Sequence, residues 1–319
     1  MKFERNFLTG FLLLAALLGV FIQSDYLLHI LTLVLIYAIL ASSLNLIVGY
    51  VGEFPLGHVA FFGLGAYTVA ILGAPEVGMP ITLTIPLAAF VAAAFGWLIG
   101  RITLRLNGPF FVIVTLAFAE VLRLLATNWV SLTNGPMGIA GIGHPAVLDM
   151  APWLQGKRGF VAMGIVLAAL TFFIAYRLVH SSAGRAAVTL RENNYVAQSV
   201  GIDPFRYSMF VFIVAAFLAG LAGAYYATYI SFVGPEVFGF PFTATMIIIV
   251  LLGGKGTLSG PVVGAIAVTL LEEYLREFKE LRLSLFGIIV MAVVLFAPDG
   301  VMGYVRHRFQ SLFRRTSHA

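Results

Sequence analysis

Long apolar runs, repeated along nearly the whole chain, constrain this sequence more than any other feature. A helix that crosses a bilayer needs about 20 mainly apolar residues, with a range of about 17–25. Runs near this length lie at residues 7–23, 27–48, 57–73, 81–103, 110–127, 159–179, 207–230, 238–253, 260–275 and 283–298. Lipid offers no partner to backbone polar groups, so such runs form helices. We predict an all-α, polytopic transmembrane helical bundle of about ten spans.

The composition supports one membrane domain over residues 1–319, surrounded by lipid. Hydrophobic residues make up 61% and charged residues 10% of the chain, and the mean hydropathy is +1.00. Soluble domains have about 45–50% and about 25%. The formal charge of +5 comes from scattered basic residues, so we expect no nucleic-acid partner. The first apolar run resembles a signal peptide but lacks a small-residue cleavage site, and we expect it to be retained.

Basic residues predict the orientation of the bundle, because cytoplasmic loops are enriched in Lys and Arg. They gather at the N-terminus, after the fourth span, after the sixth span and in the C-terminal tail. These residues are Lys2, Arg5, Arg101, Arg105, Arg177, Arg206, Arg306 and Arg308. Ten crossings place all four groups on one side. Both termini are therefore predicted to be cytoplasmic, at the cost of leaving Lys157 and Arg158 outside.

The stretch 181–201, SSAGRAAVTLRENNYVAQSVG, is the longest polar and basic interruption of the apolar pattern. Ser181 is a typical N-cap residue, and the asparagines at 193 and 194 can cap a second short turn that Gly201 ends. Arg185 and Arg191 favour the cytoplasmic side. We predict that residues 180–206 form a structured cytoplasmic loop on which a soluble partner docks.

Two glycine-rich connections differ from ordinary solvated loops. The first, residues 49–58, has three Gly, one Pro and few polar groups; the second, residues 253–261, also lies between apolar runs. Broken helices of this kind commonly form substrate sites in transporters. For the first connection a tight helical hairpin at the membrane surface is the alternative. The second lacks the G-x-x-x-x-G-K-[ST] spacing, so nucleotide binding is excluded there.

A long outer connection spans residues 128–158 and includes the stretch TNGPMGIAGIG. Connections of this length without secondary structure of their own are often functional. We expect an extracytoplasmic cap, or a surface on which a binding partner lands.

Few ionisable or polar residues lie within the predicted spans. Glu120 and Arg123 share a helix face and can pair, either as a functional site or as an interfacial pair that fixes helix rotation. Asn45 and Thr115 suit either helix–helix hydrogen bonds or contacts along a pathway. Two potential ligands, in the first connection at positions 53 and 58, are too few to predict a metal site.

The residues offer no visible catalytic set and no cysteine, so we predict neither an enzyme nor a bound cofactor. An ion-coupled carrier usually needs buried acids or unwound carbonyl sites, and a channel needs a polar pore. A permease driven by a separate ATPase needs neither, only a cytoplasmic helix that fits the motor. A stand-alone secondary carrier is the alternative from another class.

Several segments, in the same order along nearly the whole chain, resemble the LivM-like branch of the permeases of branched-chain amino acid ABC importers. They are RAAVTLRENNYVAQSVG, FLAGLAGAYY, NLIVGY, LGHVAFFGLGAY, TLAFAE, the stretch 253–264 and the closing APDG. The resemblance implies a bacterial inner-membrane protein that pairs with a second, LivH-like permease, two cytoplasmic ATPases and a periplasmic binding protein.

The resemblance also implies roles for residues. Glu192, Ala197 and Gly201 fall in the helix that couples to the ATPases, beside Arg185 and Arg191. The candidate substrate path comprises Asn45, Glu53, His58, Phe61, Phe62, Gly63, Tyr67, Thr115 and Glu120, of which Phe61 to Gly63 and Tyr67 are carried over from the family. The family usually has Gln-x-Ser where this chain has Glu53-Phe-Pro55. Urea, amides and aromatic acids are therefore alternative substrates to branched-chain amino acids.

Overall fold

The computed structural model describes residues 2–106, 108–149 and 154–277, with 287–288, 291, 295 and 300–303. Six helices in this part are long and apolar enough to cross a membrane. They are α1 (Lys2–Phe21), α2 (Asp25–Asn45), α4 (Ile81–Thr103), α5 (Pro109–Asn128), α7 (Lys157–Val179) and α10 (Pro204–Ile230). Two shorter apolar helices, α3 (Val59–Leu72) and α11 (Phe240–Gly253), accompany them, and α12 (Gly260–Leu275) follows α11. Most of the predicted span at 283–298 lies outside the described residues.

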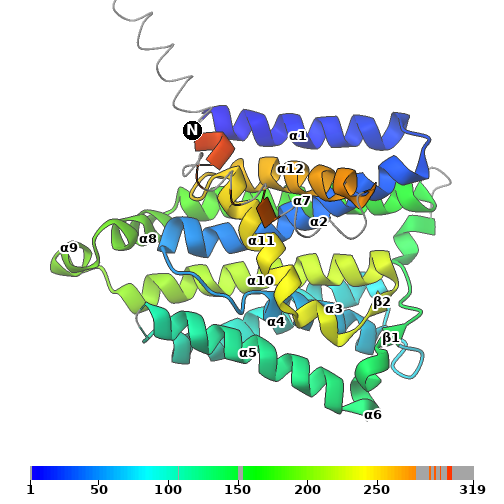
Figure 1. Cartoon of the computed structure of the whole chain (residues 1–319), viewed down its shortest axis with the longest axis horizontal. Coiled ribbons are helices and arrows are strands. Elements are labelled where there is room, and N and C mark those ends of the chain that lie inside the picture. The colour runs from blue at the N-terminus through cyan, green and yellow to red at the C-terminus, as the bar shows by residue number, and fades with distance from the viewer. Residues whose placement is uncertain are drawn as a thin grey trace, which may run out of the picture.

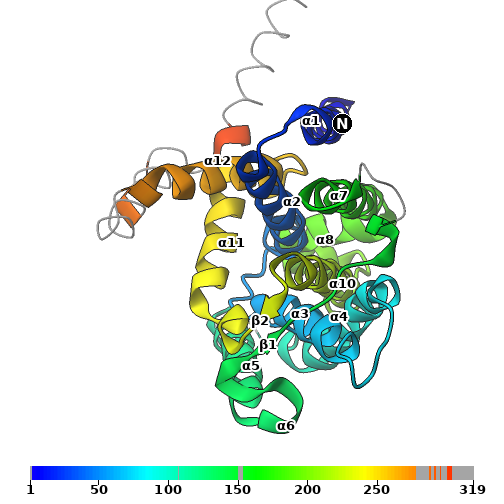
Figure 2. The same ribbon diagram turned by 90° about the vertical axis from the view of Figure 1, so that its right-hand side faces the viewer.

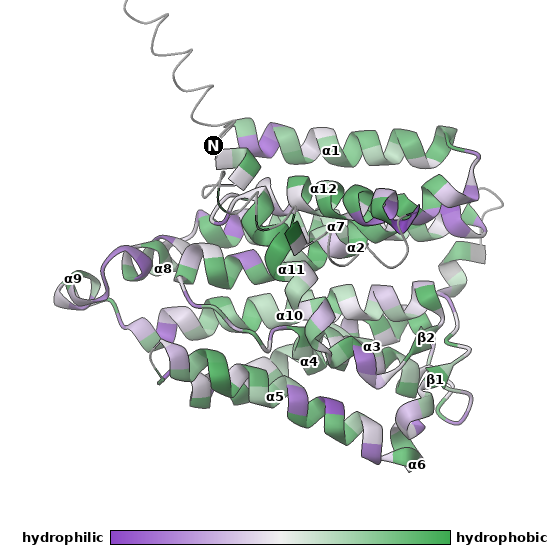
Figure 3. Ribbon diagram, viewed as in Figure 1, coloured by the Kyte–Doolittle hydropathy of each residue, from purple (hydrophilic) through white to green (hydrophobic). Residues whose placement is uncertain are grey.

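Most of the long helices run side by side, and the connections gather at the two ends of the bundle (Figure 1). At one end the chain projects as α8 (Ser182–Glu192) and α9 (Asn194–Ser199). At the other end lie α6 (Val130–Thr133) and the strands β1 (Ile139–Ala140) and β2 (Phe232–Val233). Figure 3 shows green, hydrophobic ribbons along the helices, with purple concentrated at α8 and at helix ends. This distribution is the one expected of a polytopic membrane protein.

The helices α2 and α10 form the core of the bundle. The most apolar 18-residue stretch is 78% buried in the helix that starts at Asp25 and 67% buried in α10, against 22% in α1 and 28% in α5. α10 packs against α2, α3, α4, α7 and α8. A long helix that is buried on nearly all sides needs apolar residues all round, and its sequence shows no polar stripe. The outer helices α1 and α5 keep wide exposed faces.

Small residues allow the helices around α10 to approach closely. The backbone carbonyl of Phe62 lies where a side chain at Gly223 would begin, and the carbonyl of Gly220 lies in the same way against Gly65. One turn before Gly220 on α10, Gly96 of α4 faces the methyl group of Ala216. Between helices in lipid there is no hydrophobic driving force. Small residues let the helices approach closely, and the van der Waals contacts that form stabilise their association. These contacts fix α3 and α4 against α10.

The outer connection has more structure than the sequence predicted for it. After α6 come a 3-10 turn at Gly135–Met137, strand β1 and a second turn at Ala146–Asp149. β1 pairs antiparallel with β2, with Ile139 opposite Val233 and Ala140 opposite Phe232. The sequence signal was weak because two-residue strands carry no periodicity. The pairing ties this connection to the end of α10.

We predict that Gly223→Ala lowers the free energy of unfolding by about 1–3 kcal/mol, because an added methyl group would overlap the Phe62 carbonyl. Thermal unfolding of the purified protein in detergent measures the effect as a lower Tm. Gly10→Ala on α1 is the matched control, since nothing lies within 4 Å of the added carbon. Equal Tm values for the two variants would contradict the packing described above.

Candidate functional site

The first glycine-rich connection is an interruption between two helices that do not form a hairpin. α2 widens at its end into a π-helical segment, Leu46–Val51, which the left-handed Gly52 (φ 89°) terminates. α3 begins only at Val59, has 14 residues, and packs mainly against α10 and α4. The hairpin alternative is therefore wrong. π-Helical segments inside helices are frequent at functional sites.

The chain between these helices, residues 52–58, touches two further helices. The Leu56 carbonyl accepts a hydrogen bond from Thr243 of α11 at 3.2 Å, and Gly57 lies against the Thr115 carbonyl of α5. Viewed from the end that carries the strands (Figure 2), α11 and α5 lie on the side of the molecule away from α7. The connection, α5 and α11 thus share one side of the bundle, which we call the α5–α11 face.

Asn45 joins the first glycine-rich connection to the second. Its side-chain oxygen accepts a hydrogen bond from Gly256 N at 2.9 Å, and its amide donates to the Thr257 carbonyl at 2.8 Å. Thr257 in turn bonds Gly254 O (2.8 Å) and Gly260 N (3.0 Å), which closes the turn before α12. Asn45 therefore bonds the loop before α12, whereas the sequence predicted either a second helix or a substrate pathway as its partner.

His58 and Glu53 are placed differently by the same connection. His58 is fully buried, with Nε2 at 2.9 Å from the Ser43 hydroxyl and its ring edge against Phe61. Glu53 is half buried, and no described residue forms a hydrogen bond or ion pair with it. Across the described ranges no group of three or more His, Cys, Asp or Glu could hold a metal ion.

The aromatic residues carried over to the substrate path lie in packed contacts. Phe61 meets Phe212 edge-on at 5.5 Å, and Phe62 meets Tyr226 at 5.3 Å. Tyr67 stacks on Phe238 at 5.6 Å, and Gly63 leaves room for that same ring. Phe61, Phe62 and Tyr67 are all buried. These contacts anchor α3 in the bundle. The role of these residues in a substrate path stays a prediction.

On α5, Thr115 and Glu120 occupy opposite environments. Thr115 is buried, and its hydroxyl donates to Val112 O of its own helix at 2.9 Å, not to a neighbouring helix. Glu120 pairs with Arg123 as predicted, through two hydrogen bonds of 2.8 and 2.6 Å. The two side chains are 51% and 37% exposed. In Figure 3 purple bands interrupt the green of α5. A charged pair therefore lies on the exposed side of an otherwise apolar helix.

The polar stretch 181–201 folds as the sequence predicted. Ser181 caps α8 by accepting from Gly184 N at 3.2 Å, and Asn193 caps α9 by accepting from two backbone amides at 3.1 Å. Gly201 has φ 85° and ends the second turn. A cap of this kind stabilises a helix by about 0.5–2 kcal/mol. The two short helices are thus ordered structure that projects from the bundle.

The predicted coupling residues differ in what they contact. Arg185 is exposed and donates to the carbonyl of His180 at 2.9 Å, at the nearby end of α7. Arg191 donates to Glu192 and to the Gly49 carbonyl of the π-helical segment. Ala197 is completely buried. Only Arg191 in this group bonds to the membrane part of the chain far from it in sequence.

Sequence reasoning missed the apolar tip of this projection. Tyr195, Val196 and Val200 are 87%, 55% and 69% exposed. Exposed large apolar side chains in an ordered, projecting element mark a contact surface for another protein. Their clustering in a stretch that is otherwise polar was the signal that could have identified them.

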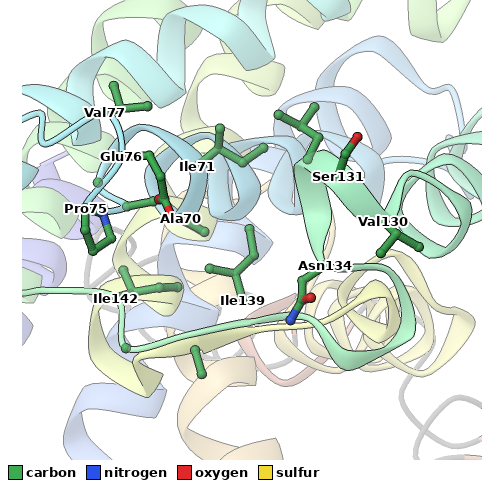
Figure 4. Close-up of a pocket in the computed structure, with 15 residues that line it drawn as sticks. Ala70, Ile71, Pro75, Glu76, Val77, Val130, Ser131, Asn134, Ile139 and Ile142 are labelled. Atoms are coloured by element: carbon green, nitrogen blue, oxygen red, sulfur yellow. The ribbon is translucent and has the colours of Figure 1, made fainter.

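A pocket of about 490 Å³ opens at the other end of the bundle (Figure 4). The end of α3 and the turn that follows it form one wall, and α6 and β1 form the other. Glu76, Ser131 and Asn134 supply polar groups among side chains such as Ile71 and Ile139. This pocket was not predicted, because its two walls are about sixty residues apart in the sequence.

An apolar bundle that has, in the part of the chain that the structure describes, six helices long enough to cross a membrane is the architecture of a multi-pass membrane protein. The chain matches the family model described as "Branched-chain amino acid transport system / permease component" over residues 26–298, and it belongs to this family. No solved structure matches the chain.

The relatives include both kinds of permease from one transport system. The high-affinity branched-chain amino acid permease LivM of Escherichia coli is 32% identical over 324 residues, which cover 95% of this chain and 76% of LivM. LivM of Salmonella typhimurium is 32% identical over 92% of this chain and 74% of its own length. LivH of Escherichia coli is 26% identical over 84% of this chain and 91% of LivH.

We predict that Asn45→Ala destabilises the protein by about 1–3 kcal/mol, because it removes the side-chain partner of the buried Thr257 carbonyl and of the partly buried Gly256 N. Unfolding in mixed micelles measures the change. Asn128→Ala is the control, since that exposed amide bonds only Leu124 O of its own helix. A stable Asn45→Ala protein would show that the two connections are held together by other contacts.

Proposed function

We propose that this chain is the transmembrane permease subunit of an ABC importer that moves branched-chain or related small hydrophobic amino acids into the cell. The family and the printed names of LivM and LivH support the class of substrate. Two cytoplasmic ATPases supply the energy, since this chain has no phosphate-binding loop of the required spacing. The observation that carries the proposal is the ordered projection α8–α9.

The projection has the properties of a docking element for a motor. One side of α8 is buried against the bundle through Gly184, Ala187 and Leu190, while α9 extends beyond it with an exposed apolar tip. A motor that binds this tip would act on α8, because α9 follows α8 after one residue and packs against it. Arg185, Glu192, Ala197 and Gly201 belong to this element in our proposal, together with Arg191.

The orientation follows from placing α8–α9 in the cytoplasm. Arg177 and Arg206 flank the projection and satisfy the preference of basic residues for that side. The strand pair and the pocket then face the outside, and both termini are cytoplasmic after ten crossings. The compartment we propose is the bacterial inner membrane.

The α5–α11 face is where we place the substrate path and the second permease. An exposed Glu120–Arg123 pair within a span is costly against lipid, so its neighbours are protein or water. The non-helical backbone of residues 52–58 has the same requirement. Glu53, which has no partner in the described chain, lies on this connection. A related, LivH-like permease would cover the face and enclose a path between the two subunits.

The pocket at the strand end is the surface we assign to a periplasmic binding protein. It combines an acidic group, Glu76, with exposed apolar side chains on its rim, among them Val77 and Val130. Interfaces between proteins use such mixtures of apolar anchors and polar groups. The binding protein delivers the substrate at the end opposite to the motors.

Urea, amides or aromatic acids are alternative cargoes within the same importer class, because Glu53 and Pro55 replace the usual family residues of the first connection. A stand-alone secondary carrier is the alternative of another class. It would accumulate substrate on an ion gradient without ATP. The projection α8–α9 would then have no partner.

We predict ATP-dependent leucine uptake by proteoliposomes that contain the two permeases, the two ATPases and the binding protein. Leaving out ATP or the binding protein should reduce uptake to background, since neither gradient coupling nor direct entry is expected. Competition by urea, an amide and phenylalanine ranks the alternative cargoes. Leucine accumulation by this chain alone on a proton or sodium gradient would contradict the proposal.

Single-cysteine labelling tests the orientation, because the natural chain contains no cysteine. A membrane-impermeant thiol reagent applied to intact spheroplasts should leave Asn194→Cys unmodified and label Val77→Cys. Both positions are exposed, so a difference in labelling reports which side of the membrane each position faces. Labelling of Asn194→Cys from outside would overturn the docking of cytoplasmic ATPases.

A further inference from the structure

Arg191 lies where three segments of the chain meet. It is the penultimate residue of α8, and its guanidinium donates to the carbonyl of Gly49, 142 positions away. The same guanidinium bonds Glu192, through Nε at 3.2 Å. The last carbonyls of a helix have no partner within that helix. A cation near this C-terminal end also interacts favourably with the helix dipole. Arg191 therefore caps the π-helical end of α2 from another helix.

The backbone around Arg191 consists of glycines that leave room for its side chain. A Cβ at Gly52 would stand 2.7 Å from Arg191 Cγ, and one at Gly256 would stand 3.0 Å from Arg191 Nη1. Both glycines have left-handed φ values, 89° and 74°. Gly52 belongs to the first glycine-rich connection and Gly256 to the second. The arginine thus packs against both connections at once.

A second link runs between the two connections themselves. Asn45 bonds Gly256 N and the Thr257 carbonyl, and Gly49 approaches Gly256 so closely that no side chain fits between them. Direct contacts therefore hold the π-helical segment against the loop before α12. With Arg191 added, α8, the end of α2 and this loop form one hydrogen-bonded unit.

We propose that Arg191 is a positioning residue that transmits the movement of α8 to both glycine-rich connections, and so links ATP hydrolysis to opening of the substrate path. The inference rests on the proposed function and deepens it, since it names the contact through which the motor acts. Arginine suits this role because its planar group holds two partners in a fixed geometry. Without this contact, α8 could follow the ATPases while the connections stay in place.

The test uses the complete importer in proteoliposomes and measures substrate uptake and ATP hydrolysis on the same samples. Arg191→Ala should lower uptake by about tenfold or more, because a hydrogen bond to a charged group is lost. ATP hydrolysis should remain within about twofold of the wild type. The number of ATP molecules used per substrate then rises by about fivefold or more. Arg191→Lys keeps one donor and should recover part of the uptake.

Arg101→Ala is the matched control, because Arg101 is exposed at the end of α4 and lies over the ring of Trp97 in its own helix, outside the coupling element. It should leave the ratio of ATP to substrate unchanged. The double variant of Arg191→Ala with Asn45→Ala should transport no worse than the poorer single variant, as expected for residues in one unit. Fully additive losses would overturn the shared unit.

The outcomes separate this inference from the proposed function. A wild-type complex without ATP-dependent uptake overturns both. If the wild-type complex transports substrate and Arg191→Ala has an unchanged ratio of ATP to substrate, only the transmission by Arg191 is overturned. Arg191→Ala and Arg191→Gln could instead lose uptake and hydrolysis equally, with less complex recovered. This result would assign Arg191 a purely structural role and would also overturn its role in transmission.

Discussion

The whole architecture depends on one constraint, which is that a backbone polar group inside a bilayer must find its partner within protein. Helices satisfy this rule along their length, and most of the chain is helical for that reason. The exceptions are the two glycine-rich connections. There Asn45, Thr257 and the guanidinium of Arg191 bond the amides and carbonyls that a continuous helix would have satisfied. The side chains that bond these unpaired backbone groups also join segments that are distant in the sequence.

The helices and their caps could be predicted from the sequence, because each depends on neighbouring residues. The length of an apolar run sets a span, and Ser181 and Asn193 cap α8 and α9 through amides two or three residues away. The partnership of Glu120 with Arg123 is equally local. These features require no knowledge of which helices meet.

Contacts between distant segments could not be predicted in the same way. Nothing near Arg191 in the sequence indicates Gly49 as its partner, and nothing near Phe61 or Tyr67 distinguishes an aromatic wall of a path from the packed ring contacts observed. Thr115 shows the same limit, because its hydroxyl turns back to its own helix. The resemblance to a family supplied the class of protein, whereas the linkage between its parts came only from the fold.

The small strand pair at the end of the bundle opposite α8 has a mechanical consequence. It fastens the chain after α6 to the chain after α10, so one end of the bundle is closed by backbone hydrogen bonds. The opposite end is joined to α8 through side chains. A displacement of α8 would therefore act first on the helix ends nearest to it, because the strand pair holds the far ends together.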